Sequence, residues 1–321
     1  SASINDDIAP EVEISTSNLS ETSVTLNVTA VDGQSGLAES GTYKYYLGNS
    51  LQATNETNSY TFTGLTDGAQ YTLKVIVTDR AGKTTEKSLT ITTIEYPTIE
   101  EKLKEGDYVN YVDKNGNTRI CVVLYGPENT NYSTYGIQII TMETVESISI
   151  GGNDLNTARN SYNNIITTFN TRAEAYLNTT YATSARSVGT IPNNPSYDAA
   201  TMYTREDDWF ADYNGTFKDS DENYLTDWNQ MINLGIASMG STYWLPSRYA
   251  NKGGVEVAFT MRFIYGNQDS TSIASLCSIY SYTDNTFYLT PSGLRPVFTL
   301  KNGLKVTGGT GTENSPYTLG T

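Results

Sequence analysis

The stretch GLTDGAQYTLKVIVTDRAGK, residues 64–83, alternates apolar and polar side chains between two turn sequences. Tyr71, Leu73, Val75 and Val77 occupy every second position, so an extended chain places them on one face. The turn sequences TDG and DRAGK bound this run. The stretch therefore predicts a β-strand with one face buried in a sheet.

The neighbouring segments repeat this alternation. In SVTLNVTAV, Val24, Leu26 and Val28 share one face, and Val12 and Ile14 do the same in EVEIS. Further strands are predicted in GTYKYYLG, NSYTFTGL and KSLTITT. Turn sequences recur at short spacing, which is typical of a β-sandwich of about seven strands.

Leu65 precedes Tyr71 at the spacing of a tyrosine corner, and the stretch 64–83 resembles the end of a fibronectin type III domain. The resemblance implies an all-β sandwich of the fibronectin type III or immunoglobulin kind over residues 1–97, in which the Tyr71 hydroxyl ties a loop back to the strand. The tryptophan usual in an early strand is missing, and Leu26 lies in its neighbourhood. On bacterial surface proteins such a domain is commonly a spacer; an independent ligand site is the alternative.

The pattern changes near residue 97, where Pro97 interrupts the strands. TIEEKLKEG then predicts a short helix with Thr98 as its cap and Gly106 as its stop. We expect the domain boundary here, with a second domain over residues 98–321.

The second domain mixes strands with two helices. Strands are predicted in DYVNYV, TRICVVLYG and YGIQIITMETVESISI around the hairpin sequence DKNGN. DLNTARNSYNNIITTFNTRAEAYL and NYLTDWNQMINLG have helical spacing, the second with Leu225, Trp228, Met231 and Ile232 on one stripe and Gly235 as C-cap. A long polar segment, residues 182–223, separates the helices. These elements predict an α+β domain.

The order of GDYVNY, ARNSYNNIITTFN, YATSARSVG, YWLPSR, GLRPVFTL and VTGGTGTENSPYTL resembles bacterial surface or prepilin-like proteins that end in a C-type-lectin-like domain. Some of these are variable proteins diversified by retroelements. The fold is also distantly similar to formylglycine-generating enzymes, which use a pair of reactive cysteines. Only Cys121, in a predicted buried strand, and Cys277 are present here, and we expect both thiols to be unpaired.

In the resembling proteins the segment between YWL.SR and G.RPV varies and lies across the ligand-facing surface. Retroelement diversification acts at adenines and cannot create Lys, Glu, Gln, Met or Trp from Asn codons; residues 269–290 contain none of these. The segment is rich in Tyr, Ser, Thr and Asn, as antibody paratopes are. The candidate ligand-binding residues are Tyr249, Phe263, Tyr265, Asn267, Asp269, Tyr280, Tyr282, Asp284, Asn285 and Phe287.

The two sequences that flank this segment are expected to be framework. Trp244, Leu245, Leu294, Val297 and Phe298 are predicted core residues. Arg248 and Arg295 are expected to hold the framework through ion pairs or contacts with carbonyl groups.

An acidic loop precedes the second helix. In DSDENYLTD, Asp219, Asp221, Asn223 and Asp227 stand at positions one, three, five and nine of an EF-hand-like loop, which makes them candidate calcium ligands. The pattern lacks Gly at position six and Glu at position twelve, and the alternative is that these acids cap the helix or are solvated. We predict no other cofactor.

Charge and composition restrict the partners. The net charge of −15 argues against nucleic acid and anionic membranes, which attract clustered Lys and Arg. No apolar run of 18 residues is present, so we predict no direct membrane insertion by this chain. The absence of histidine removes imidazole acid–base chemistry and most zinc sites.

Three functions remain. The first is a non-enzymatic binding protein displayed on the bacterial surface or a pilus, an adhesin or receptor for a protein or glycan on another cell or host surface. The second is a structural pilin or surface subunit that packs against other pilus subunits. The third is a glycan-acting enzyme, for which Asp207 and Asp227 are candidate carboxylates.

Overall fold

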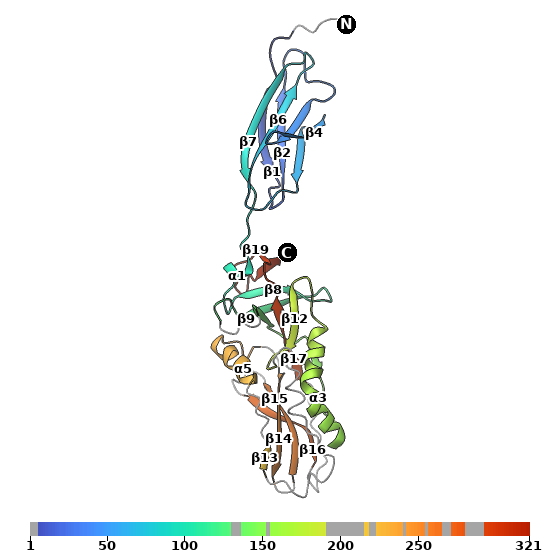
Figure 1. Cartoon of the computed structure of the whole chain (residues 1–321), viewed down its shortest axis with the longest axis vertical. Helices are drawn as coiled ribbons and strands as arrows, with labels where there is room; N and C mark the ends of the chain where they lie inside the picture. The colour runs from blue at the N-terminus through green and yellow to red at the C-terminus, as the bar shows by residue number, and fades with distance from the viewer. Residues whose placement is uncertain are drawn as a thin grey trace. The chain divides into compact units, whose positions relative to one another are not determined.

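The computed structural model describes residues 6–129, 136–151, 155–190, 215–217, 223–239, 242–253, 256–264, 271–279 and 292–321, with backbone alone for 155–159, 215–217, 223–225, 247–253, 256–260 and 271–279. The described chain is mostly β-structure (Figure 1). It divides into two compact units, residues 1–96 and 97–321. None of the described helices has the length and apolar character needed to cross a bilayer.

The first unit consists of two antiparallel sheets that enclose one apolar core. One sheet has the order β1-β2-β5 and the other β4-β3-β6-β7. The strands are β1 Glu11–Ser17, β2 Ser23–Val31, β3 Tyr43–Leu47, β4 Ser50–Asn55, β5 Ser59–Thr63, β6 Gln70–Thr78 and β7 Thr84–Thr92. The predicted inward faces are confirmed, since Val24, Leu26, Leu73 and Val75 are fully buried.

Strand β4 is absent from the predicted set. Its sequence, SLQATN, has no apolar alternation, and most of its side chains are exposed. It pairs with β3 at one edge of the four-stranded sheet. Only Ala53 of this strand packs against the core, so β4 is held mainly by its backbone pairing with β3 and has little apolar pattern to reveal it.

The second unit begins with helix α1, Ile99–Lys102, as predicted. Thr98 and Glu101 form a capping box, in which each side chain accepts a hydrogen bond from the other residue's backbone N–H. These two hydrogen bonds satisfy the backbone N–H groups of Thr98 and Glu101 at the start of the helix. The DKNGN hairpin is also confirmed, with Gly116 at φ +81°.

Two further sheets form the framework of the second unit. The larger has the order β12-β18-β10-β9-β8-β20-β19, and the other β11-β17-β14-β15-β16, with β13 on β14. The strands are β8 Tyr108–Val112, β9 Thr118–Tyr125, β10 Gln138–Thr141, β11 Glu146–Ile148, β12 Ala182–Ser187, β13 Gly215–Phe217, β14 Tyr243–Gly253, β15 Glu256–Ile264, β16 Thr271–Ile279, β17 Ser292–Leu294, β18 Pro296–Leu300, β19 Lys305–Gly308 and β20 Tyr317–Gly320.

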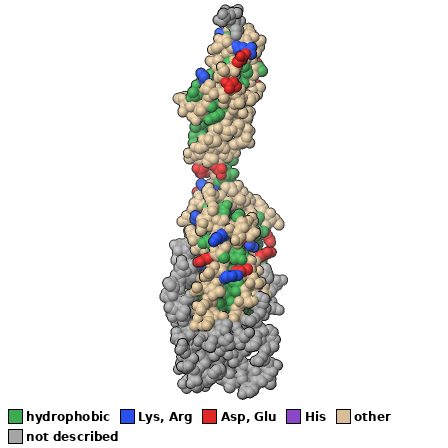
Figure 2. All heavy atoms as spheres, turned by 90° about the vertical axis from the view of Figure 1, so that its right-hand side faces the viewer, with side chains coloured by type: hydrophobic (Ala, Val, Ile, Leu, Met, Phe, Trp, Pro, Cys, Tyr) green, Lys and Arg blue, Asp and Glu red, His purple; other side chains and the backbone are tan. Residues whose placement is uncertain are grey.

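Two long helices pack on these sheets. Helix α3 spans Leu155–Glu174 and contacts β12, β14, β15 and β16. Tyr162, Ile165 and Phe169 on this helix are buried as predicted. Helix α5 spans Asn223–Asn233 and contacts β9 and β14. Backbone atoms and side chains that are neither charged nor hydrophobic make up much of the described surface in Figure 2.

Two features of this unit differ from the predictions. The first part of the polar segment, Ala182–Ser187, is strand β12, which pairs with β18. On α5, Met231 is buried and Trp228 is partly buried against the core, as predicted, but Ile232 is 40% exposed and Asp227 is buried. Asp227 forms an ion pair with a residue of β12 that is described below.

Candidate functional site

The segment predicted to bind a ligand begins within a sheet of long strands. Strands β14, β15 and β16 pair in antiparallel order, with Tyr249 opposite Thr260 and Thr260 opposite Ser275. Of the ten candidate ligand residues, Tyr249 lies in β14 and Phe263 in β15. The Tyr249 side chain and the other eight residues, Tyr265, Asn267, Asp269, Tyr280, Tyr282, Asp284, Asn285 and Phe287, lie outside what the structure describes.

The two ends of this segment meet inside the core. Strand β14 pairs in parallel with β17 through Tyr243 and Gly293, and the Gly293 N–H donates to the Thr242 carbonyl at 2.9 Å. A side chain at Gly293 would place its Cβ about 2.0 Å from the Thr144 methyl carbon, so only glycine fits this pairing. The close approach explains the glycine in GLRPV.

Trp244 fixes the base of β14. Its indole is 3% exposed, and Nε1 donates to the Ile148 carbonyl at 2.9 Å. The ring meets Phe169 of α3 edge-on at 6.5 Å between centroids and Phe263 of β15 at 5.9 Å. Trp244 is therefore a core residue, as predicted, and Leu245, Leu294, Val297 and Phe298 are buried with it.

Phe263 belongs to the same cluster. Its ring is partly buried against Trp244 and packs on the hydrophobic core between α3 and the sheet. Phe263 was predicted to contact a ligand. In the structure its described contact is with Trp244, so it contributes to the packing of the framework.

Arg295 holds the other end of the framework. The side chain is fully buried, and Nε donates to the Thr141 carbonyl at 2.9 Å while Nη1 donates to the Ile236 carbonyl at 3.3 Å. The guanidinium carbon lies 4.8 Å from the centroid of the Tyr243 ring, a cation–π distance. Desolvation lowers the pKa of Arg295, although an arginine stays charged at neutral pH. The predicted contacts with carbonyl groups are confirmed for Arg295, and the Arg248 side chain lies outside the described residues.

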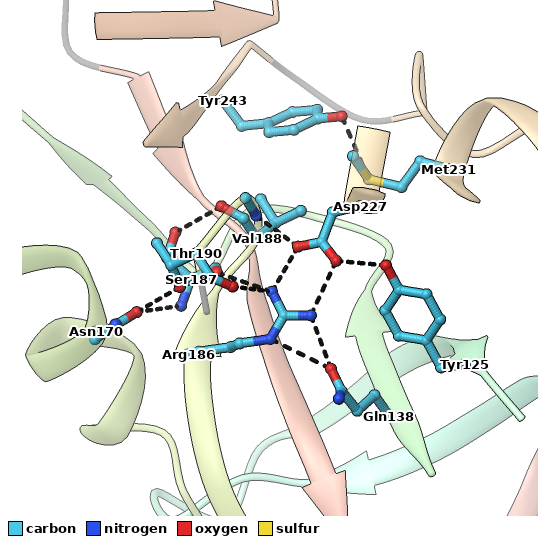
Figure 3. Close-up of polar contacts among 11 residues, drawn as sticks. Tyr125, Gln138, Asn170, Arg186, Ser187, Val188, Thr190, Asp227, Met231 and Tyr243 are labelled. Atoms are coloured by element: carbon cyan, nitrogen blue, oxygen red, sulfur yellow. Dashed lines mark hydrogen bonds and ion pairs between the residues drawn. The ribbon is translucent and has the colours of Figure 1, made fainter. Parts of the chain in front are cut away.

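A second buried arginine links the larger sheet to α5 (Figure 3). Arg186 on β12 forms an ion pair with Asp227, and both side chains are almost fully buried. Arg186 Nη2 donates to Asp227 Oδ1 at 3.0 Å and to the Gln138 side-chain oxygen at 2.7 Å. The Tyr125 hydroxyl donates to Asp227 Oδ1 at 2.8 Å, and burial next to this carboxylate raises the pKa of Tyr125.

The turn after β12 completes the network. The Gly189 N–H donates to Asp227 Oδ2 at 2.7 Å, and Arg186 Nη1 donates to the Thr190 carbonyl at 2.8 Å. Asn170 on α3 accepts hydrogen bonds from the Ser187 N–H and the Thr190 hydroxyl. Strand β12, α3 and α5 are thus joined by one chain of polar contacts, as the dashed lines in Figure 3 show.

The arrangement determines what Asp227 can do. Each of its oxygens accepts two hydrogen bonds from Arg186, Gly189 or Tyr125. No oxygen is left for a calcium ion or for proton transfer to a substrate, so Asp227 is a structural partner of Arg186 rather than a metal ligand or a catalytic carboxylate. Asp219, Asp221, the Asn223 side chain and Asp207 lie outside the described residues.

Sequence reasoning did not select Arg186, Gln138 or Tyr125. The sequence contained one indication of this ion pair. Asp227 precedes Met231 by four residues and therefore lies on the same face of α5. An acid on an apolar helix face indicates a buried basic partner. The sequence does not identify that partner among the arginines of the chain.

Comparison with known proteins gives no relative: the chain matches no family model, no curated protein and no solved structure. Function is therefore inferred from the residues and their arrangement.

Proposed function

We propose that the chain is a non-enzymatic binding protein of the bacterial surface, an adhesin or receptor, with a pilus subunit or tip as one form. In this proposal residues 1–97 are a fibronectin type III-like spacer. Residues 98–321 are a C-type-lectin-like domain whose variable, retroelement-diversified segment 249–290 contacts a protein or glycan on another cell or host surface.

The observation that carries the proposal is the closed base of this segment. Tyr243 and Gly293 pair in one sheet, and Trp244, Leu245 and Leu294 beside them are buried. Residues of this segment that do not contribute to the core can change without unfolding the domain, whereas Met261 and Ile264 are fully buried and belong to the framework. A diversified binding face requires this separation between framework and contact residues.

The first unit supports the spacer assignment. Its two antiparallel sheets, β1-β2-β5 and β4-β3-β6-β7, enclose one core, which agrees with the proposed sandwich. The Tyr71 hydroxyl accepts a hydrogen bond from the Thr66 N–H at 2.9 Å, as expected of a tyrosine corner. Hydrogen bonds with the Thr66 side chain and then with its backbone lower the pKa of Tyr71.

The test is a binding experiment with paired variants. The labelled full chain is screened on immobilised glycans and on intact bacterial and mammalian cells, and the dissociation constant is measured on the best target. Replacing Tyr280 and Tyr282 together by Ala should weaken binding by about 2 kcal/mol or more, roughly 30-fold, as for aromatic hot spots. The melting temperature should stay the same.

Two controls separate binding from folding. Leu51→Ala, at an exposed position of the first unit, should leave both affinity and stability unchanged. Trp244→Ala should unfold or severely destabilise the second unit. If replacing Tyr280 and Tyr282 by Ala lowers the melting temperature as much as Trp244→Ala does, the two tyrosines are core residues and the proposal is wrong.

Diversification has its own test. The DNA beside the coding sequence should contain an adenine-rich template copy of codons 249–290 next to a reverse transcriptase. Sequences from related isolates should then differ mainly within these codons. Equal variation across the framework codons for 243–245 and 293–298 would contradict a retroelement.

A further inference from the structure

Three aspartates from separate parts of the chain meet at one end of the first unit. Asp6 precedes β1, Asp32 follows β2, and Asp79 follows β6. One carboxylate oxygen of each residue lies within 4.8 Å of the other two. Leu37 and Asp79 form an isolated β-bridge that brings the two loops together. Figure 2 shows acidic and basic side chains at this end of the sandwich.

The carboxylates are held in place by backbone N–H groups. Asp6 accepts from Ile8 and Ser35, Asp32 from Gln34 and Gly36, and Asp79 from Lys83. Local turns thus fix Asp32 and Asp79, while Asp6 is also held by the backbone of Ser35 in the loop after β2.

Two oxygens of this group are buried without a partner. Asp79 is 2% exposed, and its Oδ2 has no hydrogen-bond partner among the described residues. Asp32 Oδ2 is also buried and has no hydrogen-bond partner among the described residues. A buried carboxylate oxygen without a donor is costly, and a second carboxylate nearby adds repulsion. Two such oxygens within one acidic group therefore indicate a missing positive charge.

The charged side chains nearby do not supply that charge. Lys83 acts on Asp6 through its field, but no ion pair to Asp6, Asp32 or Asp79 occurs among the described side chains. Arg80, next to Asp79, instead pairs with Glu39 at 3.0 Å. The three carboxylates thus carry more negative charge than their surroundings balance.

We propose that Asp6, Asp32 and Asp79 bind a divalent cation, with calcium as the best fit. Calcium takes oxygen ligands at about 2.3–2.6 Å, so two ligands on opposite sides of the ion are separated by up to about 5 Å. The three oxygens all lie within 4.8 Å of one another, so one calcium ion can reach all of them. Magnesium usually keeps several waters and is seldom held by an all-protein site, and zinc prefers nitrogen and sulfur.

The ion would act on the stability of the first unit. It would tie the segment before β1 to the β2–β3 and β6–β7 loops, which fixes three pieces of chain at once. Carbonyl groups or water would complete the coordination, since calcium takes six to eight oxygens. The site is separate from residues 219–227, where the sequence alone suggested calcium.

Calorimetry on the full chain tests the proposal. The protein is treated with a chelator and titrated with calcium chloride, in a background with Asp219→Asn and Asp221→Asn to remove the acids of the other segment. Asp79→Asn and, separately, Asp6→Asn should weaken calcium binding by on the order of tenfold or more, because ligand charge sets affinity. Asp7→Asn is the matched control, an exposed neighbour outside the group, and should bind as the parent does.

Thermal unfolding tests calcium binding in a second way, and its first measurement uses the unmodified chain. Calcium at about one hundred times its dissociation constant should raise the melting temperature of the first unit by roughly 10 °C. Asp32→Asn should raise that temperature without calcium, by relieving repulsion, and should abolish most of the calcium-dependent rise. Stabilisation by Asp32→Asn that is equal with and without calcium would overturn the proposal, as would a titration that the Asp79 and Asp6 variants leave unchanged.

Discussion

The two units place their charges differently. The core of the first unit consists of apolar and tyrosine side chains, and its acidic group lies at the end of the sandwich. The core of the second unit includes two arginines, Arg186 and Arg295, at 5% and 0% exposure. Removing a side chain from the first core leaves a cavity, whereas removing a partner of Arg186 leaves a buried charge.

The difference also concerns distance along the chain. In the first unit each buried strand face follows a local alternation of residues. In the second, Arg186 meets Asp227 across 41 positions and Arg295 meets Thr141 across 154. Local patterns therefore determine the first core, while the second depends on pairings between distant segments.

The largest effect is expected at Trp244, where the second core holds the base of the variable segment. Trp244→Ala removes a buried indole, its contacts with Phe169 and Phe263, and the hydrogen bond to Ile148. We expect the free energy of unfolding of the second unit to fall by about 5 kcal/mol. Urea unfolding measures this loss, and Trp244→Phe should cost less. A loss below about 1 kcal/mol would exclude Trp244 as the anchor of the segment.

The next effect tests the buried ion pair. Asp227→Ala leaves the Arg186 guanidinium buried without its carboxylate, which should cost the second unit about 4 kcal/mol. Replacing both residues, with Arg186→Met and Asp227→Leu, should cost less than Asp227→Ala alone. The control is Glu146→Gln, which breaks the more exposed pair with Arg172 and should cost about 1 kcal/mol or less. Equal losses from the two pairs would mean that burial does not distinguish them.

A cavity in the first core should have a smaller effect. Leu26 is fully buried between the two sheets, and Leu26→Ala should lower the stability of the first unit by about 3 kcal/mol. Calorimetric melting of the full chain should show this loss in the first unit while the second is unchanged. Leu51→Ala, at a 52% exposed leucine, is the matched control and should cost less than about 0.5 kcal/mol. Movement of both transitions by Leu26→Ala would mean that the two cores are not independent.

The smallest effect concerns a single hydroxyl. Tyr71→Phe removes the hydrogen bond from the Thr66 N–H and should destabilise the first unit by about 1 kcal/mol, as measured by urea unfolding. Tyr60→Phe provides the comparison, because the Tyr60 ring stacks on Tyr45 and has no described hydrogen bond through its hydroxyl. If the two variants lose the same stability, the corner bond contributes nothing measurable.

This contrast explains which parts of the fold could be predicted from the sequence. Strand β2 was predicted with its observed bounds, because Val24, Leu26 and Val28 alternate with polar residues. Strand β12 was assigned to a polar segment, because ATSARS carries no apolar alternation. Its place depends on pairing with β18 and on Asp227, and neither contact leaves a local pattern.

The candidate site divides in the same way. The framework residues Trp244, Leu245 and Leu294 were predictable, because large apolar side chains beside a strand sequence are usually core. The role of Asp227 was not, since an acid near a helix start is compatible with a cap, a metal ligand or an ion pair. Only the position of Arg186 distinguishes these roles. The ligand-facing residues stay a prediction.

The pairing of Tyr243 with Gly293 has a consequence for chain length. It closes the chain segment that contains strands β15 and β16, and the entropy lost on closing a flexible loop grows only with the logarithm of the number of residues enclosed. Doubling the length of a flexible loop adds only about 0.6 kcal/mol to that cost. Insertions between residues 280 and 291, after β16 and before β17, should therefore be tolerated, whereas an insertion within β15 would shift the register that buries Met261 and Ile264.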